Sequence, residues 1–243
     1  MNAELQRPLI VFLHEGLGSL SQWKEFPRQL CDAANCRGLV FSRPGYGNSS
    51  PRTEPWPQDY LQEQARYLLP ACFDSLGLQD EPLLLFGHSD GASLALLFAA
   101  YFPQRVRALV AMAPHLFVEP ITITGLRAAK RAYEQERSPL RAALARHHAD
   151  TDSAFYGWND AWLRPGFEGT WNIEAELRGH LACPVLAIQG EDDEYATLAQ
   201  IEAIRQLHPA TELLALADCG HAPQRDQAEQ VISRTVEHFS RRR

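Results

Sequence analysis

Short apolar runs alternate along the chain with longer segments that have the spacing of amphipathic helices. Leu9–Leu13 is a continuous apolar run between Pro8 and a glycine-containing turn, which is typical of a strand buried on both faces. Five similar runs follow. Together they predict strands at Leu9–Leu13, Gly38–Phe41, Leu83–Phe86, Val106–Ala111, Val185–Ile188 and Glu212–Leu216, with helices over 21–32, 58–77, 90–102, 197–207 and 223–239. This alternation favours an α/β fold with a mostly parallel central sheet of about six strands, covered by helices on both faces.

One connection between predicted strands is far longer than the others. Residues 115–179 contain helix-like segments rich in Arg, Ala and Glu, and they include Trp158, Trp162 and Trp171. No linker, internal repeat or low-complexity tract marks a second independent domain. We therefore predict a single domain over residues 1–243, into which residues 115–179 are inserted as a helical cap.

The composition narrows the classes of protein to consider. Apolar residues make up 45% of the chain and charged residues 22%, as in ordinary globular proteins. The net charge of -7 argues against a nucleic-acid surface, which needs clustered Lys and Arg. The longest apolar run, Leu94–Phe102, is too short to span a bilayer, and the five cysteines form no CxxC pair. We expect a cytoplasmic protein that acts on a small molecule, with no nucleic-acid or membrane partner, no metal and no cofactor.

A Gly-x-Ser-x-Gly pentapeptide is centred on Ser89. The apolar strand that ends at Phe86 precedes it and a helix-forming segment follows it, which is the strand–turn–helix context of a nucleophilic serine. Gly87 and Gly91 leave room where side chains would collide with the neighbouring strand and helix. Ser89 is therefore the predicted nucleophile, with the N-terminus of the next helix placed to stabilise an oxyanion.

A serine nucleophile needs a general base and an acid that orients it. Gln189–Asp193 follows the fifth predicted strand, and Cys219–His221 follows the sixth. Both segments are loops at the carboxyl ends of strands, where parallel sheets place their sites. The chain order is therefore Ser, Asp, His.

Two further motifs make the chain resemble the α/β-hydrolase superfamily over essentially its whole length. The segment 13–18 (Leu-His-Glu-Gly-Leu-Gly) resembles the oxyanion loop, and the segment 42–49 resembles the Arg-Pro-Gly-x-Gly-x-Ser turn. The resemblance implies an N-terminally trimmed version of that fold, because many members carry two additional strands first. It also implies a catalytic set with Ser89 as nucleophile, His221 as base, Asp193 as acid with Asp192 as the alternative, and the backbone N–H groups of Gly16 and Asp90 as oxyanion hole.

Glu15 stands beside this site, where members of the family commonly carry glycine after the histidine. We interpret its side chain as facing solvent or pairing with Arg43; the alternative is that it tunes a pKa or repels anionic acyl groups. Trp158, Trp162 and Trp171 either form the core of the cap or line a substrate pocket.

These residues predict a serine hydrolase that cleaves a carboxylic ester, lactone or thioester of a small molecule through an acyl-enzyme on Ser89. Two alternatives stay open: a hydrolase of carbon–carbon bonds in ring-cleavage products that uses the same triad, and a catalytically silent hydrolase fold that binds a ligand. An exposed edge of the trimmed sheet also suggests a homodimer as a hypothesis.

Overall fold

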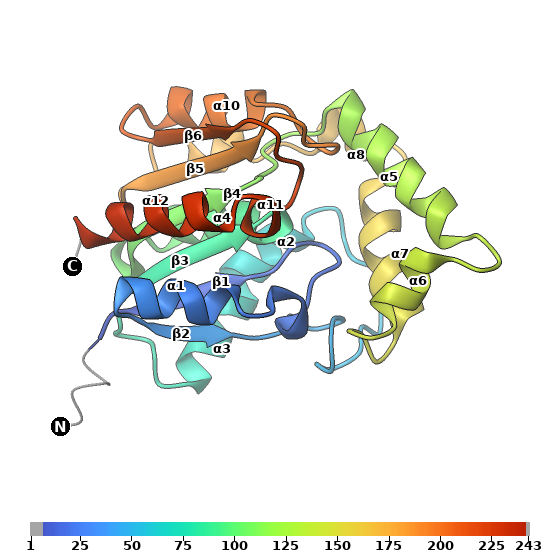
Figure 1. The fold of residues 1–243 in the computed structure, drawn as a ribbon, viewed down its shortest axis with the longest axis horizontal. Helices are drawn as coiled ribbons and strands as arrows, with labels where there is room; N and C mark the ends of the chain where they lie inside the picture. Colours follow the sequence, from blue (N-terminus) through green and yellow to red (C-terminus); the bar gives the residue numbers. More distant parts are fainter. Residues whose placement is uncertain (1–6, 242–243) are drawn as a thin grey trace.

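The fold is built on one sheet of six strands, with helices on both of its faces (Figure 1). It comes from a computed structural model that describes residues 7–241. The strand order is β2-β1-β3-β4-β5-β6, and every neighbouring pair is parallel. The strands are β1 (Leu9–Leu13), β2 (Arg37–Val40), β3 (Leu83–His88), β4 (Val106–Met112), β5 (Val185–Gly190) and β6 (Glu212–Leu216). The predicted parallel sheet is confirmed.

Successive side chains of each strand point to opposite faces of the sheet, so each apolar strand contributes side chains to the hydrophobic cores on both faces. In β1, Val11 packs in the core on one face, whereas Ile10 and Phe12 pack in the core on the other. The first face is covered by α3 (Leu69–Ser75), α4 (Asp90–Tyr101) and α10 (Ala199–Leu207), and the second by α1 (Phe26–Ala34) and α12 (Ala228–Ser240). Burial on both faces explains why the strands are continuous apolar runs.

Some helices differ from the predicted ranges for local reasons. The segment predicted as one helix over 58–77 forms α2 (Tyr60–Glu63), the π-helical turn η3 (Gln64–Leu68) and α3. Pro70 has no N–H to donate to the carbonyl of Arg66, and the wider turn lies directly before it. The first helix begins at Phe26 rather than at residue 21, because Pro27 suits a first helical turn. None of the described helices is both long and apolar enough to cross a membrane.

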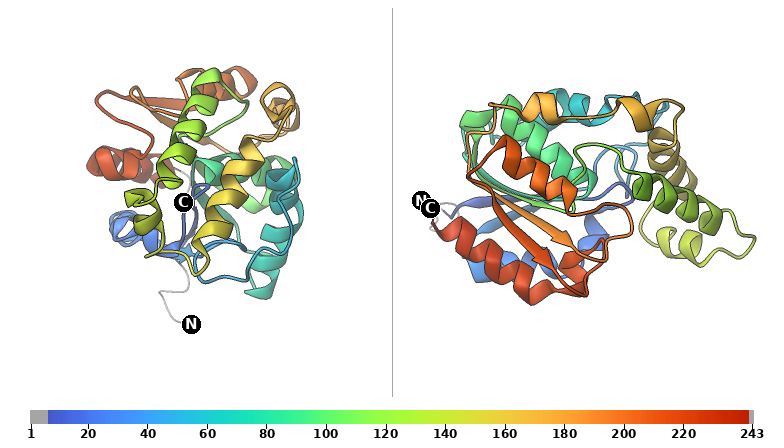
Figure 2. Two further views of the ribbon diagram at one scale, coloured as in Figure 1. Left: turned by 90° about the vertical axis from the view of Figure 1, so that its right-hand side faces the viewer. Right: turned by 90° about the horizontal axis from the view of Figure 1, so that it is seen from above.

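The long connection between β4 and β5 is helical. It contains α5 (Pro120–Tyr133), α6 (Pro139–Leu144), α7 (Thr151–Trp162), α8 (Phe167–Thr170) and α9 (Glu174–Leu177). Its two ends are joined by a bridge between Phe117 and Asn172 and by a 2.8 Å hydrogen bond from the Ile173 N–H to the Leu116 carbonyl. Figure 2 shows that α5, α6 and α7 project beyond one end of the sheet. The insertion therefore covers the end at which the strands finish.

The turn between β3 and α4 requires glycine for steric reasons. A Cβ atom at Gly91 would lie 2.0 Å from the carbonyl oxygen of Leu13, at the end of β1. We predict that Gly91→Ala lowers the free energy of unfolding by about 3 kcal/mol or more, because the backbone of α4 must shift away from β1. Equilibrium urea unfolding measures this change.

Gly169→Ala is the matched control, because an added Cβ at Gly169 meets nothing within 4 Å. It should leave stability unchanged or raise it by up to about 1 kcal/mol, since Ala is the better helix former. Equal stabilities for the two variants would contradict the steric account.

Candidate active site

Ser89 lies on a sharp turn at the carboxyl end of β3, directly before α4. Its backbone has φ 54° and ψ -121°, a conformation that L-residues rarely adopt. The turn is held by a 2.9 Å hydrogen bond from the Ser89 N–H to the Met112 carbonyl. A Cβ atom at Gly87 would lie 2.2 Å from the Gly91 carbonyl oxygen, so both glycines of the pentapeptide are needed. The serine hydroxyl is thereby fixed at the end of the sheet.

The structure brings Ser89, His221 and Asp193 together, although they are far apart in the sequence. The Nε2 atom of His221 lies 2.9 Å from Ser89 Oγ, and its Nδ1 atom lies 2.7 Å from Asp193 Oδ2. Asp193 is buried, and its Oδ1 atom accepts a 2.7 Å hydrogen bond from the Tyr195 N–H. Asp192, the alternative acid, has an exposed side chain. Asp193, rather than Asp192, therefore contacts the imidazole.

The electrostatic environment prepares His221 to accept a proton. Burial alone would lower the pKa of His221, but the hydrogen bond and the negative charge of Asp193 outweigh it and raise the pKa above its usual value. The same contact acts in the opposite direction on the acid. Burial would raise the pKa of Asp193, yet the hydrogen bond and charge of His221 hold it below its usual value. Asp193 therefore stays ionised beside the imidazole.

A buried arginine orients the loop that follows β1. The Nη2 atom of Arg43 donates to the carbonyl oxygens of His14 and Glu15, at 3.1 and 3.0 Å. Because a trans peptide is planar, its C=O and N–H point in opposite directions. With the Glu15 carbonyl turned toward Arg43, the Gly16 N–H points the other way. Within residues 7–241 neither this N–H nor that of Asp90 has a backbone acceptor, and both residues line the same cavity as Ser89.

Arg43 also faces the carboxylate of Asp90, the residue after Ser89. The two side chains are buried, with Nη2 4.0 Å from Oδ2. Oδ2 of Asp90 accepts a 2.5 Å hydrogen bond from the Tyr60 hydroxyl, which in turn accepts a 2.9 Å bond from Trp162 Nε1. Burial raises the pKa of Asp90 despite these contacts. This buried network links the residue behind the nucleophile to the oxyanion loop and to α7.

Glu15 does not pair with the Arg43 side chain, so that part of the prediction is wrong. Arg43 is fully buried and faces backbone carbonyls, whereas the Glu15 carboxylate lies 3.4 Å from His88 Nδ1. Burial would raise the pKa of Glu15, but the hydrogen bond and charge of His88 lower it to about 2. Its side chain is 26% exposed. The site therefore holds an ionised carboxylate at neutral pH.

A cavity of about 110 Å³ lies over Ser89, beneath the helical insertion. Its walls include Trp158 and Trp162, in agreement with the alternative that these tryptophans line a pocket. Trp171 is not among the lining residues; it packs against Trp162, with ring centres 4.9 Å apart. The lining is formed by Glu15, Gly16, Leu17, Ser89, Asp90, His115, Thr122, Leu126, Trp158, Trp162, Tyr195 and His221. Within residues 7–241, no group of three or more His, Cys, Asp and Glu side chains could hold a metal ion.

Five of these residues were not predicted: Leu17, His115, Thr122, Leu126 and Tyr195. His115 follows β4, and Tyr195 follows Asp193 by two positions. Both are thus on loops at the carboxyl ends of strands, which is the one sequence signal that could have marked them. Thr122 and Leu126 are one turn apart on α5 and reach the cavity only because the insertion folds over it.

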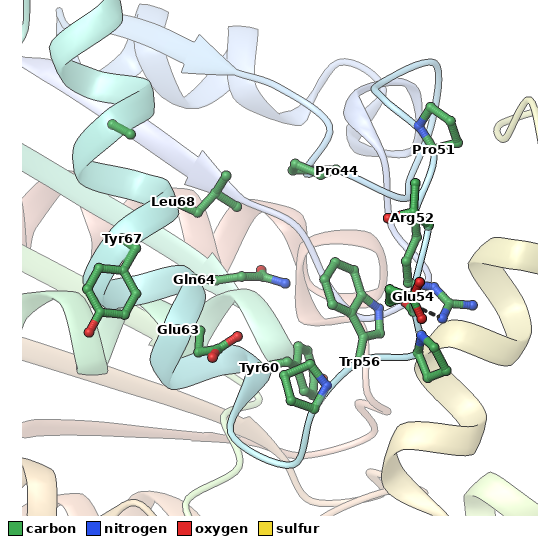
Figure 3. Close-up of a pocket in the computed structure, with 14 residues that line it drawn as sticks. Pro44, Pro51, Arg52, Glu54, Trp56, Tyr60, Glu63, Gln64, Tyr67 and Leu68 are labelled. Carbon is green, nitrogen blue, oxygen red and sulfur yellow. Dashed lines mark hydrogen bonds between the residues drawn. The ribbon is translucent and has the colours of Figure 1, made fainter.

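A larger groove of about 660 Å³ lies elsewhere on the surface (Figure 3). It is lined by the proline-rich loop 51–57 and by residues of α2, η3 and α3. Trp56 stacks on Tyr60 in its wall. The described residues that line it include no serine, cysteine or histidine. The smaller cavity over Ser89 is therefore the candidate active site.

Residues 10–234 match the model of the alpha/beta hydrolase family. Because this match covers most of the chain, the protein belongs to that family. The strand–turn–helix around Ser89 and the parallel sheet agree with this assignment.

Individual relatives are distant. The chain is 29% identical over 203 residues to 2-hydroxymuconate semialdehyde hydrolase of Pseudomonas putida, covering 75% of this chain and 71% of the relative. It is 27% identical over 152 residues to the serine hydrolase BPHL of Mus musculus, covering 61% of this chain and half of the relative's length. The fold is similar to that of the enol-lactonase from Burkholderia xenovorans LB400, with a TM-score of 0.75 and 20% identity over 97% of this chain and 92% of the other.

Removing one partner of the buried Arg43–Asp90 pair should destabilise the fold strongly, because the other charge is then buried without a partner. We predict that Arg43→Met lowers the free energy of unfolding by about 3–5 kcal/mol, since it leaves the Asp90 carboxylate without its cation. Adding Asp90→Asn should recover at least about 1 kcal/mol, because a buried amide is less costly than a buried charge. Urea unfolding of the single and double variants measures both effects.

Arg141→Met is the control, since Arg141 pairs with Asp152 at a site where both side chains are about half exposed. Its loss should stay below about 1 kcal/mol. A loss for Arg43→Met as small as that of the control would refute the role of the buried pair.

Proposed function

We propose that this protein is a serine hydrolase that cleaves a small carboxylic ester, lactone or thioester through an acyl-enzyme on Ser89. The observation that carries the proposal is the continuous hydrogen-bonded chain from Asp193 through His221 to Ser89, inside a cavity. Ser89 Oγ attacks the carbonyl carbon while His221 Nε2 accepts its proton. The imidazolium then gives that proton to the leaving group.

Water completes the cycle by the same chemistry. His221 accepts a proton from the water that attacks the acyl carbonyl, and returns it to Ser89 Oγ as the acid product leaves. In both steps the carbonyl oxygen becomes an oxyanion, which the N–H groups of Gly16 and Asp90 are placed to stabilise. The N-terminus of α4 lies behind Ser89 and adds a favourable dipole.

The cavity favours a small acyl group without negative charge. Its volume of about 110 Å³ is below the range of roughly 300–1,000 Å³ that is usual for drug-sized ligands. Among the described residues that line it there is no Lys or Arg, whereas Glu15 is ionised. An anionic substrate would be repelled here and would find no cation to pair with.

Hydrolysis of a carbon–carbon bond is the second candidate, supported by the similarity to 2-hydroxymuconate semialdehyde hydrolase. That relative's substrate is, by its name, a carboxylate. The cavity of the present protein offers Glu15 rather than a cation toward such a group, so ester cleavage fits it better. A ligand-binding role without catalysis is disfavoured, because the side chains of Asp193, His221 and Ser89 form a continuous hydrogen-bonded chain.

Ser89→Ala should remove both turnover and covalent labelling. We expect kcat/KM for p-nitrophenyl acetate to fall by at least about 10⁴-fold, because no other group can form the acyl-enzyme. Labelling by a fluorophosphonate probe should disappear in the same variant. Ser75→Ala is the control, since the Ser75 hydroxyl bonds only to the carbonyl of Cys72 on the exposed side of α3. Labelling that persists in Ser89→Ala would exclude Ser89 as the nucleophile.

The pH dependence should report the ionisation of His221. The base must be neutral to accept the serine proton, so kcat/KM should fall as pH decreases through the pKa of His221, which lies above its usual 6.5. Asp193→Asn removes the charge that raises this pKa. We predict that the acid limb then moves to lower pH, and that kcat falls by about 10³–10⁴-fold.

Asp192→Asn is the matched control for this experiment, because the Asp192 side chain is exposed and lies next in sequence. Its acid limb should coincide with that of the wild type. If Asp192→Asn moved the limb and Asp193→Asn did not, the assignment of the acid would be reversed.

Glu15→Gln should relax the selection against anionic acyl groups. We predict that the kcat/KM ratio of p-nitrophenyl hemisuccinate to p-nitrophenyl butyrate rises about tenfold, since a like charge near the acyl group is removed. Glu229→Gln, an exposed substitution on α12, serves as control. An unchanged ratio in Glu15→Gln would show that its carboxylate does not select the substrate.

A further inference from the structure

A second imidazole faces the cavity over Ser89 and takes no part in the mechanism above. His115 is 4% exposed, and its ring centre lies 5.9 Å from that of His221 and 5.1 Å from that of Trp162. Its Nδ1 atom is buried and has no hydrogen-bond partner among the described residues. The imidazole therefore has hydrogen-bonding capacity that the described residues do not use, and His115 is one of the residues that line the cavity.

The backbone of His115 is held in a fixed position relative to the nucleophile. Its N–H donates to Ser93 Oγ at 3.0 Å, and Ser93 Oγ donates to its carbonyl at 2.6 Å. Ser93 lies one helical turn after Ser89 on α4. The next residue, Leu116, donates its N–H to Gln200 Oε1 at 2.7 Å. Two buried polar side chains thus position the segment that carries the imidazole, as expected of a preorganised binding group.

His115 is uncharged under physiological conditions. Burial, and then the nearby His221, lower the pKa of His115 to about 3. A neutral imidazole has one N–H donor and one acceptor nitrogen. It therefore suits a neutral oxygen, and a hydroxyl group above all, because a hydroxyl can both donate and accept.

We propose that His115 is a specificity-determining residue that hydrogen-bonds a hydroxyl group carried by the acyl part of the substrate, close to the scissile carbonyl. The proposal rests on the proposed function of Ser89. The acyl part becomes bonded to Ser89 in the first step and is released from it in the second, so it is the part that the cavity must accommodate throughout. Because the cavity is small, only a substituent near the carbonyl can reach His115. The substrate class is then the esters, lactones or thioesters of hydroxy acids.

The test compares esters that differ only by a hydroxyl in place of a methyl group. The first pair is p-nitrophenyl 2-hydroxypropanoate and 2-methylpropanoate, and the second is p-nitrophenyl 3-hydroxybutanoate and 3-methylbutanoate. For at least one pair, the wild type should favour the hydroxy ester about tenfold or more in kcat/KM. In His115→Phe that ratio should fall about tenfold, because the apolar ring leaves the hydroxyl unpaired. In His180→Phe, an exposed site outside the cavity, the ratio should not change.

His115→Asn provides a second variant, because the amide of asparagine keeps both a donor and an acceptor. The ratio of kcat/KM for the hydroxy ester to that for the methyl ester should lie between those of the wild type and His115→Phe. Ratios that are equal in the wild type and both variants would overturn the proposal, as would a wild type that prefers the methyl esters of both pairs. Fluorophosphonate labelling of Ser89 is measured in parallel. Wild-type protein that resists labelling would reject the hydrolase function itself, whereas labelling with unchanged ratios rejects only the role of His115.

Discussion

The active site depends on the close approach of the first turn of α4 to the end of β1. Gly91 lies so near the Leu13 carbonyl that a Cβ atom would be 2.0 Å away. This contact places Ser89, on its strained turn, next to the loop that carries Gly16. Without it, Ser89 and the N–H of Asp90 would lie apart from the Gly16 N–H, which follows β1. A single steric constraint thus brings the reacting group and its electrostatic support together.

Three buried or partly buried ionisable pairs then set the charges around the site. Asp193 raises the pKa of His221, Arg43 lies against Asp90 beside the loop that follows β1, and His88 lowers the pKa of Glu15. Each pair joins two different connections of the sheet. Since a charge left alone in such a place is costly, the pairs constrain these loops as well as tune the chemistry. Glu15 and His115 also line the cavity, and we propose that they distinguish between substrates.

The sequence predicted the framework because its signals are local. Apolar runs marked all six strands, and the resemblance to the α/β-hydrolase superfamily pointed to Asp193, the carboxylate that contacts His221. The partner of Glu15, the packing of Trp171 behind Trp162 and the position of His115 in the cavity wall depend on how distant segments meet. No local pattern contains that information, because the Arg43 guanidinium binds backbone carbonyls and the Gln64 side chain rather than the Glu15 carboxylate. The break in the helix before Pro70 was readable, but the wider turn it accompanies was not.

The central claim is that Ser89 forms an acyl-enzyme. It is tested most directly by mass spectrometry of the intact protein, quenched in acid during turnover of a slowly hydrolysed p-nitrophenyl ester, followed by peptide mapping. The account predicts a mass increase equal to that of the acyl group, located on Ser89, which disappears as the ester is consumed. An acyl group on another residue, or steady hydrolysis of that ester by the wild type with no covalent adduct on Ser89, would contradict it.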